Sequence, residues 1–569
     1  DDQYLITLCK SWLETYRQNT NFFLTIDLET TGSDYINGNV LLYSISWNGK
    51  QAVVFSPHFM WGLFSSKGQG ESWDLFLEVL KTIPINNQNI KFDAKWWLSQ
   101  YGILVNIIFD PMIAAQLCYA GGFPGNRFSL DNLAKYLLYP MEISKGFQTS
   151  FIGQPVTQRC TFDQIHYAAN DSLVTHRLVE PLVTRLKTNE LWDLWEEVEL
   201  PLLSSLIVSE VKGVKIDVPS VKAEYEKAKE VHLEIGKQLQ LEYQKIPEET
   251  RPQFPGNEFN PNSPKQIEQI LNSVGIRVPK TSKDALSDAL VKHPDCNIIK
   301  HILDSKKIQN GTLKYFKAWL EEHINPTTGC IHPNFKSNGT DTGRMASSDP
   351  NMQNIPPHLR HLIIARDGYD IITVDFSQFE FRAAAAYTME QYLIDTYNER
   401  AELLPLVVEL GKQFKEPDPD HFVKEAKKGK YDLTKGQKEL VDRFAGTDIH
   451  RRNASLVLNL PINEITDKHR SLGKTLGYAL LYGAGPRRML DQLIVSGFYD
   501  TTLADCNMYG QTFMKQLPKV SSFISEIHER VLDPGFIETF MGRKRFFPLP
   551  PPYQTRYYEQ KLEDAKRQA

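Results

Sequence analysis

Apolar and β-branched runs dominate the chain from Asn21 to about Ser56. They occupy residues 22–32 (FFLTIDLETTG), 40–50 (VLLYSISWNGK) and 51–57 (QAVVFSP) and are interrupted by Gly, Asn and Pro, which is typical of strands joined by turns. Stretches with apolar residues every three or four positions follow, and this period predicts helices; they cover residues 73–83, 94–103, 112–120, 129–138 and 163–194. Strands followed by interleaved helices predict an α/β domain over about the first 190 residues.

The rest of the chain has a different pattern. A second helical region begins near Leu200, and within it Ser263 followed by Pro264 predicts a helix N-cap with proline at the first helical position. Between Met389 and Thr447 lies a polar stretch with KEAKKGKYDLTKGQKE at its centre. This stretch indicates either an inserted surface subdomain or a charged face. A solvated connector and a DNA-contacting segment are equally compatible with it.

Length and composition place this chain among ordinary globular proteins. Its 569 residues exceed what one core holds, so we expect roughly two to four domains. The hydrophobic share of 41% and the charged share of 23% exclude disordered, collagenous and membrane-spanning classes. No apolar run reaches the ~20 residues that cross a bilayer, so no membrane association is expected. The chain starts without Met, and we expect a processed or engineered end there.

Charge and cysteine content restrict the kinds of site. The six cysteines show no C-x-x-C spacing, which argues against a zinc site or a disulfide framework and favours a reducing compartment. The net charge is −5. Any surface that binds nucleic acid must therefore be a local concentration of Lys and Arg.

A first group of candidate residues consists of acids in the α/β region. Asp27 and Glu29 lie two apart at the end of an apolar strand, so both side chains leave the same face of the sheet. Alone, such a pair is more often a pair of surface carboxylates. The segment Asn89-Ile-Lys-Phe-Asp93 adds a third acid just before a predicted helix.

Two more residues complete this group. Tyr167 and Asp171 are four apart and share one helix face. Four acids at one point repel one another unless divalent cations neutralise them, which is the arrangement for two-metal phosphodiester hydrolysis. Because all the ligands are hard oxygens, Mg²⁺ is the expected ion, two per site, with Mn²⁺ as a substitute. Tyr167 is expected to orient the attacking water.

The order D-x-E, N-x-x-x-D and Y-x-x-x-D resembles the three exonuclease motifs of the DEDD family, in its tyrosine-bearing branch. This resemblance implies a ribonuclease-H-like fold and removal of nucleotides in the 3′→5′ direction. All four acids are present, so we expect an active exonuclease.

The second group is a ladder formed by Arg470, Lys474, Tyr478 and Tyr482, which recur every four residues. In an α-helix this spacing forms one slowly drifting stripe. Two cations near the helix N-terminus suit a triphosphate, and the aromatic rings suit a sugar and a base. The alternative is that the tyrosines are core residues and the cations a solvated face. A Walker A loop is excluded because position 468 is Lys instead of Gly.

Two segments before the ladder change its interpretation. Residues 342–356 (TGRMASSDPNMQNIP) and 375–382 (DFSQFEFR) precede it in order. Together with the ladder they resemble family A DNA polymerases, the bacterial polymerase I type, with motif A at 375–382 and motif B at the ladder. The resemblance implies a right-hand polymerase domain with thumb, palm and fingers, and primer–template DNA and dNTPs as partners.

Individual roles follow from this resemblance. Asp375 is implied as a catalytic metal ligand, helped by the carbonyl of Phe376, and the apolar segment 370–378 is predicted to be the strand that carries it. Lys474 is implied as a catalytic cation. The remaining implied roles are a steric gate against ribose at Glu380, a phosphate contact at His450, structural support at Arg382, and DNA contacts at Arg344, Gln378 and Arg567. Tyr478, where many relatives have Phe, predicts weak discrimination against dideoxynucleotides.

The chain departs from the family pattern at its end. No H-D-E motif, the third of the family, follows residue 540, and the final KLEDAKRQA resembles the helix before it. We therefore expect a chain that stops before that motif and polymerises poorly. The resemblance divides the sequence into an exonuclease domain (1–195), the thumb and start of the palm (196–335) and the palm with motif A (336–390). An inserted polar subdomain (391–447), the fingers with motif B (448–540) and a return to the palm (541–569) follow.

The long stretch before residue 448, Tyr478 and their surroundings resemble the apicoplast replicative branch of the family in malaria parasites, which implies an apicoplast location. The expected function is template-directed DNA synthesis with proofreading. The alternatives are a stand-alone 3′→5′ exonuclease with a duplex-binding C-terminal region and, less favoured, a non-catalytic nucleic-acid-binding subunit. Other replication partners are not implied.

Overall fold

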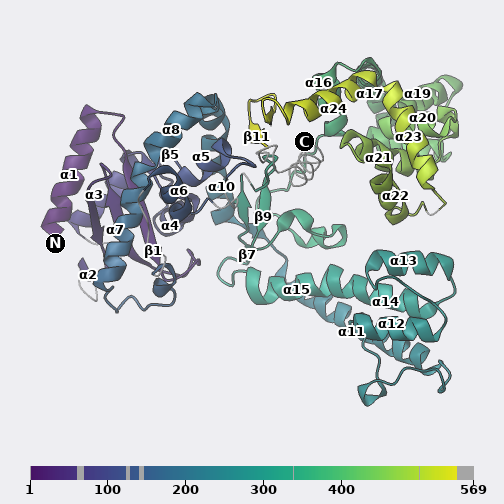
Figure 1. Cartoon of the computed structure of the whole chain (residues 1–569), viewed down its shortest axis with the longest axis horizontal. Coiled ribbons are helices and arrows are strands. Elements are labelled where there is room, and N and C mark those ends of the chain that lie inside the picture. The colour runs from purple at the N-terminus through teal and green to yellow at the C-terminus, as the bar shows by residue number, and fades with distance from the viewer. Residues whose placement is uncertain are drawn as a thin grey trace, which may run out of the picture. The chain divides into compact units, whose positions relative to one another are not determined.

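The computed structural model of the chain describes residues 2–60, 70–123, 128–139, 147–337, 339–498 and 500–547. The chain divides into two compact units, and Figure 1 labels its helices and strands. The first unit contains Asp1–Glu226, Thr312–Asp370 and Val531–Lys561, and the second contains Lys227–Gly311, Ile371–Arg530 and Leu562–Ala569. None of the helices described is long and apolar enough to cross a membrane.

A five-stranded sheet forms the centre of the first unit. Its strand order is β3-β2-β1-β4-β5. The strands β1, β2 and β3 pair antiparallel, while β4 and β5 continue the sheet parallel to β1. The predicted early strands are confirmed, and the strand bounds are Leu24–Thr30, Val40–Ser46, Ala52–Phe55, Ile85–Asn86 and Ile107–Phe109 for β1 to β5.

Helices pack against this sheet and share one apolar core with it. The predicted helices are present, but the stretch 163–194 forms three helices, α7, α8 and α9, rather than one. Among them α7 lies across β1 and β2, where Ser172 and Ser44 share a hydrogen bond of 2.7 Å. The helix bounds are Asp2–Gln18, Pro57–Met60, Glu71–Thr82, Lys91–Tyr101, Pro111–Cys118, Leu130–Leu137, Phe162–Arg177, Val179–Thr188 and Trp192–Leu194 for α1 to α9.

Short elements from distant parts of the chain complete the first unit. The helix α10 (Leu200–Lys212) is followed by β6 (Val214–Lys215), which pairs antiparallel with β7 (Cys330–Ile331). Two further antiparallel pairs are β8 with β9 and β10 with β11. The strands β8 to β11 have the bounds Asn334–Lys336, Ala346–Ser348, Phe536–Glu538 and Lys544–Phe546. The helix α15 has the bounds Lys314–Ala318.

The second unit is helical in its described parts. The helix α11 (Val218–Gln244) runs into it, and α12 (Pro264–Ser273) begins as predicted, with the Ser263 side chain accepting from the Gln266 N–H. A small core joins these two helices to α13 and α14. The remaining bounds are Lys283–Lys292 and Asn297–Ile308 for α13 and α14, and Phe379–Thr388, Gln391–Gln413, Pro419–Lys427, Lys435–Gly446, Ile449–Leu458, Asp467–Leu481, Pro486–Val495, Leu503–Gln516 and Pro518–Arg530 for α16 to α24.

The polar stretch between Met389 and Thr447 is a folded subdomain of α17, α18 and α19. Its helices enclose a core of their own, and a solvated connector has no such core, so that interpretation is wrong. The fully or nearly fully buried members are Leu403, Val407, Leu410, Phe422, Val423, Leu433, Val441 and Phe444.

The strand predicted at 370–378 is not formed. No strand includes these residues, and none of the described strands pairs with them. The side chains of Ile372 and Val374 are 85% and 82% exposed. High β propensity orders a segment only when a neighbouring strand supplies backbone hydrogen bonds, and no described residue does so here.

Candidate functional site

The first candidate site lies at the end of β1 in the first unit. One carboxylate oxygen from each of Asp27, Glu29 and Asp171 lies within 4.8 Å of the others. Asp27 and Glu29 leave the same face of β1, and α7 brings Asp171 onto that face. Glu29 and Asp171 are 8% and 9% exposed. Three acids far apart in sequence therefore meet in a largely buried cluster.

The fourth predicted acid, Asp93, joins this cluster through hydrogen bonds. Its Oδ1 accepts from the Leu28 N–H at 3.1 Å. The side-chain amide of Asn87 donates to Asp93 Oδ2 at 2.8 Å and to Asp27 Oδ1 at 3.2 Å. The motif residue Asn89 has a different place: its φ is 57° and its N–H donates to Asp110. Asn87 is thus the amide that bridges two acids, and the sequence pattern offered no signal for it beyond its position directly after β4.

A buried ion pair anchors the helix that carries Asp93. Two residues before it, Lys91 pairs with Glu210 and donates to the Phe335 carbonyl at 2.6 Å. Lys95 on the next turn of α4 also pairs with Glu210, at 3.0 Å. Burial lowers the pKa of Lys91, and the Glu210 carboxylate opposes that shift. The first turn of α4 is therefore held on the side facing away from the cluster.

Burial and mutual repulsion favour protonated acids in this cluster. Burial raises the pKa of Asp27 to about 6 and, with the charge of Asp27, that of Asp171 to about 8. The pKa values of Glu29 and Asp93 are raised well above the ordinary range by burial and then by neighbouring acids. Tyr167 donates a hydrogen bond to Asp171. A divalent cation would offset this repulsion.

These residues fit a divalent metal ion. All four acids offer hard oxygen ligands, which suit Mg²⁺ or Mn²⁺. Among the residues that the structure describes, Asp171 Oδ1 is buried without a hydrogen-bond partner, and such an atom is costly unless a ligand satisfies it. The Tyr167 ring lies beside the rings of Phe147 and Phe151, each at 6.4 Å between centroids.

The second candidate site is on α21 in the second unit. Arg470 and Tyr478 are half-buried, Lys474 is exposed, and Tyr482 just after the helix is 58% exposed. The opposite face carries the core residues, including Leu472 and Leu476. Tyr482 is therefore not a core residue, whereas Tyr478 is partly buried and packs against the core. The interpretation of both tyrosines as core residues is wrong for Tyr482.

Two glycines on the core face let α20 approach α21 closely. A Cβ added to Gly473 would lie 2.2 Å from the His450 carbonyl oxygen and 2.6 Å from the Ala454 nitrogen. One added to Gly477 would lie 2.5 Å from the Asn453 side chain. The position of the ladder relative to α20 therefore depends on these glycines.

The close approach places His450 and Asp448 against the ladder. Arg470 donates to Asp448 Oδ2 from Nη2 at 2.7 Å and from Nε at 3.1 Å. Burial acts to raise the pKa of Asp448, but Arg470 outweighs it and the pKa is lowered. Burial, with the charges of Arg470 and Lys474, lowers the pKa of His450 to about 4. His450 is 4% exposed, so it is a neutral, buried group in this structure.

Residues of motif A lie beside the ladder. The pKa of Tyr478 is raised, first by burial and then by the charges of Glu380, Tyr482 and Asp375. These three side chains therefore all influence the Tyr478 hydroxyl. The Tyr478 ring also lies 5.3 Å from that of Phe381. The structure thus brings Asp375 and the predicted gate residue into the neighbourhood of the ladder, although Asp375 lies on an exposed segment outside any strand.

The remaining predicted residues have varied positions. Gln378 precedes α16 with a φ of 57°, and Phe376 beside Asp375 is 75% exposed. Arg382 donates to the Ser377 carbonyl at 2.9 Å and lies over the Tyr397 ring, which is a structural position. Arg344 belongs to the first unit, in the loop before β9. Arg567 lies outside the described residues.

A cavity of about 470 Å³ opens beside the ladder between α21 and α22. Its lining combines two cations, one acid, three neutral polar side chains and one aromatic ring, and the cations and the ring suit an anionic ligand with a flat ring. The lining residues are Lys474, Thr475, Tyr478, Arg488, Asp491, Gln492 and Ser496.

Comparisons with known proteins match both parts of the chain. A family model described as DNA polymerase family A matches residues 229–418 and 434–569. A model described as 3′-5′ exonuclease matches residues 6–187. The interruption of the first match falls within the subdomain of α17–α19.

Curated relatives cover much of the chain at low identity. DNA polymerase I of Aquifex aeolicus is 27% identical over 484 residues, or 81% of this chain and 71% of the relative. DNA polymerase I of Pseudomonas aeruginosa is 24% identical over 95% of this chain and 54% of its own length. For thermostable DNA polymerase I of Thermus caldophilus the identity is 28%, over 67% of this chain and 40% of the relative. The match therefore spans only about half the length of several relatives.

The fold has a solved counterpart. The polymerase domain of Pol1 from M. smegmatis, in a complex with DNA primer–template and dNTP, superposes with a TM-score of 0.70 at 17% identity. The similarity covers 98% of this chain and 83% of that chain. The chain thus has the α/β multidomain fold in which an N-terminal exonuclease domain is followed by a polymerase domain.

Proposed function

Because this chain belongs to DNA polymerase family A, we propose that it copies DNA by adding dNTPs to a primer 3′ end and proofreads through its acid cluster. One observation carries the polymerase part: Arg470 and Lys474 lie one helical turn apart on a partly exposed face of α21, and Tyr478 on the same helix is close enough to Asp375 and Glu380 for their charges to raise its pKa. A structurally similar polymerase domain holds primer–template and dNTP, which supports the same ligands here.

The polymerase residues have distinct tasks in this proposal. Arg470 and Lys474 hold the triphosphate oxygens, and Lys474 neutralises charge on the departing pyrophosphate. Tyr478 meets the sugar, and Glu380 fills the space of a ribose 2′-hydroxyl. Asp375 and the Phe376 carbonyl would supply ligands to two divalent cations, which would activate the primer 3′-hydroxyl and stabilise the charge that develops at the phosphoryl group.

In this proposal the acid cluster catalyses a different reaction, in which water hydrolyses the terminal phosphodiester and releases the last nucleotide as a monophosphate. Asp27, Glu29, Asp93 and Asp171 would hold two divalent cations that lower the pKa of a water and stabilise the leaving oxygen. The Tyr167 hydroxyl, held at Asp171, orients that water. The Asn87 amide, by donating to both Asp27 and Asp93, fixes the positions of these two acids relative to each other.

DNA contacts and location complete the proposal. Arg344 and Gln378 contact the minor groove of the primer–template, where acceptors common to all base pairs allow geometry to be checked without reading sequence. Arg567 contacts the template.

We place the protein in the apicoplast, on the resemblance of the 391–447 subdomain and Tyr478 to that branch. Imaging of the tagged protein in another compartment would refute this placement.

Extension and degradation of a 5′-labelled primer on a template, with Mg²⁺ and with or without dNTPs, test both activities. Asp375→Ala should lower extension by more than about 10²-fold and leave degradation intact. Asp370→Ala, an exposed acid on the same segment, is the matched control and should extend normally. Extension that persists in Asp375→Ala would overturn the metal assignment.

The acid cluster has an equally close control. Asp171→Ala should abolish degradation without dNTPs, whereas Asp163→Ala, an exposed acid on the same helix, should not. The alternative function, a stand-alone exonuclease whose later region binds duplex, is favoured by the exposed position of Asp375 outside a strand. Degradation without any extension by the unmodified chain would support that alternative.

A further inference from the structure

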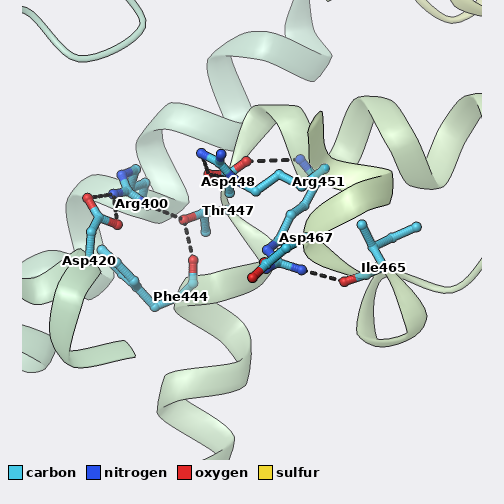
Figure 2. A network of polar contacts seen from close by, with 9 residues as sticks. Arg400, Asp420, Phe444, Thr447, Asp448, Arg451, Ile465 and Asp467 are labelled. Carbon is cyan, nitrogen blue, oxygen red and sulfur yellow. Dashed lines mark hydrogen bonds and ion pairs between the residues drawn. The ribbon is translucent and has the colours of Figure 1, made fainter. Parts of the chain in front are cut away.

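The subdomain of α17–α19 is tied to the triphosphate-binding end of α21 by a chain of polar contacts (Figure 2). This series of contacts begins with Arg400 on α17, whose Nη2 donates to both carboxylate oxygens of Asp420 on α18 at 2.7 and 2.8 Å. The same guanidinium lies 4.3 Å from the centroid of the Phe444 ring on α19. Arg400 therefore touches all three helices of the subdomain, and its side chain is only 12% exposed.

The next contact leads out of the subdomain. Arg400 Nη1 donates to Thr447 Oγ1 at 3.3 Å, and Thr447 Oγ1 in turn donates to the Phe444 carbonyl at 2.7 Å. Thr447 is fully buried and, with Asp448, forms the two-residue turn between α19 and α20. A second arginine, Arg452 on α20, donates to the Gly446 carbonyl just before this turn at 2.7 Å. The turn is therefore held from both sides.

Asp448 in this turn has two partners on different helices. One oxygen caps α20 by accepting from the Arg451 N–H at 2.9 Å. The other accepts from Nε and Nη2 of Arg470. An arginine has five N–H donors in a rigid planar fork, so an acceptor on its Nε–Nη2 edge sets the plane in which the other donors lie. The position of the turn therefore sets the orientation of the guanidinium on α21.

We propose that the α17–α19 subdomain positions Arg470 for the triphosphate of the incoming nucleotide, through Arg400 and the Thr447–Asp448 turn. The inference rests on the proposed polymerase function and assigns Arg400 and Asp420 as positioning residues. They lie outside the ladder and need not touch the nucleotide. When Asp420 is neutralised, Arg400 loses its bidentate partner, the turn loosens, and Arg470 samples orientations that do not meet the phosphates.

The ion pairs of the subdomain offer a matched comparison. Asp420 and Asp442 are both exposed acids on the subdomain, each paired with a cation from a neighbouring helix: Asp420 with Arg400, and Asp442 with Lys427 at 3.1 Å. Surface ion pairs contribute little to stability, so neither Asp420→Asn nor Asp442→Asn should unfold the protein. Only the first belongs to the chain of contacts that reaches Arg470.

The test measures dNTP binding and use by the full chain. With primer–template, Asp420→Asn and Arg400→Lys should each raise KM for the correct dNTP by about 3- to 10-fold, the range of coupling through contiguous contacts, with a much smaller change in kcat. Arg400→Lys keeps the charge but loses the fork, so it should not rescue. The double variant should be no worse than the singles, and Asp442→Asn should match the unmodified protein.

Two further readouts make the outcome decisive. Equilibrium binding of the dNTP to the complex with a dideoxy-terminated primer requires no turnover, and degradation of primer without dNTPs reports on the other unit. An unchanged KM in both variants, an equal rise in Asp442→Asn, or a parallel loss of degradation would overturn the inference. Failure of the unmodified chain to bind dNTP or extend a primer would instead overturn the proposed polymerase function.

Discussion

A methyl group added at position 473 is expected to displace the ladder residues on α21, although it contacts none of their side chains. Gly473 faces α20, and in Gly473→Ala the new Cβ would lie 2.2 Å from the His450 carbonyl oxygen and 2.6 Å from the Ala454 nitrogen. Both contact atoms belong to the backbone of α20, so no flexible side chain can move aside. The two helices must separate.

The magnitude follows from these distances. Ordinary Cβ contacts begin at 3.4 Å, so α20 and α21 must move apart by about 1 Å. Overpacking of this kind costs ~1–3 kcal/mol, and the better helix propensity of Ala returns up to ~1 kcal/mol, which leaves a net destabilisation of about 0–3 kcal/mol. A 1 Å displacement at a catalytic site costs up to ~10²-fold in rate. We therefore expect a strong loss of extension with a modest loss of stability.

Primer extension and denaturant unfolding of the full chain check this expectation. The control is Gly236→Ala in α11, where an added Cβ meets nothing within 4 Å; there Ala should be neutral or stabilise by up to ~1 kcal/mol. Degradation of primer should be normal in both variants. If Gly473→Ala extends primers as well as Gly236→Ala does, the close contact between the helices does not determine the position of the ladder.

Three further outcomes are expected. Asn87→Ala removes the amide that bridges Asp27 and Asp93, so degradation should need a several-fold higher Mg²⁺ concentration while extension is unchanged; an unaltered Mg²⁺ dependence would contradict this. Tyr478→Phe should increase discrimination against dideoxynucleotides in primer extension, and equal incorporation by both proteins would rule out a role for the hydroxyl. Burial lowers the pKa of His176 from 6.5 to about 4; the unfolded chain then binds more protons between these values, so the stability of the first unit should fall as pH decreases from 6.5 towards 4. His176→Gln should flatten this dependence in urea unfolding curves, and an identical slope would refute it.

Local periodicity was sufficient for much of the fold. The three early strands and most helices of the first unit follow from alternation and three-to-four spacing, and the Ser263 cap was readable because capping is a local interaction. The segment 370–378 shows the limit of such reasoning. Its residues favour a strand, but a strand also needs a paired neighbour, which propensity does not supply.

The sites show the same division between local and tertiary information. Residue spacing identified the four acids, and the structure brings them together. Asn87 was missed because its role depends on two acids from other elements. The subdomain core was missed because Leu403 and Val407, which lie in the apolar run 403–408, pack against Phe422 from another helix, and local periodicity does not supply such a contact. The link from Arg400 to Asp448 likewise requires three helices to be in place.

Because the acids at the end of β1 are buried, binding of a divalent cation at the first site is expected to release protons from them. With pKa values of about 6 for Asp27 and about 8 for Asp171, part of the cluster is protonated near neutral pH in the absence of metal. Metal ligands must be deprotonated, so each binding event expels protons into the solvent. The apparent metal affinity should therefore rise with pH through this range, and the heat of binding should change with the ionisation enthalpy of the buffer. Nucleotide removal would then be sensitive to the acidity of the surroundings even though water, rather than a protein acid, attacks the DNA.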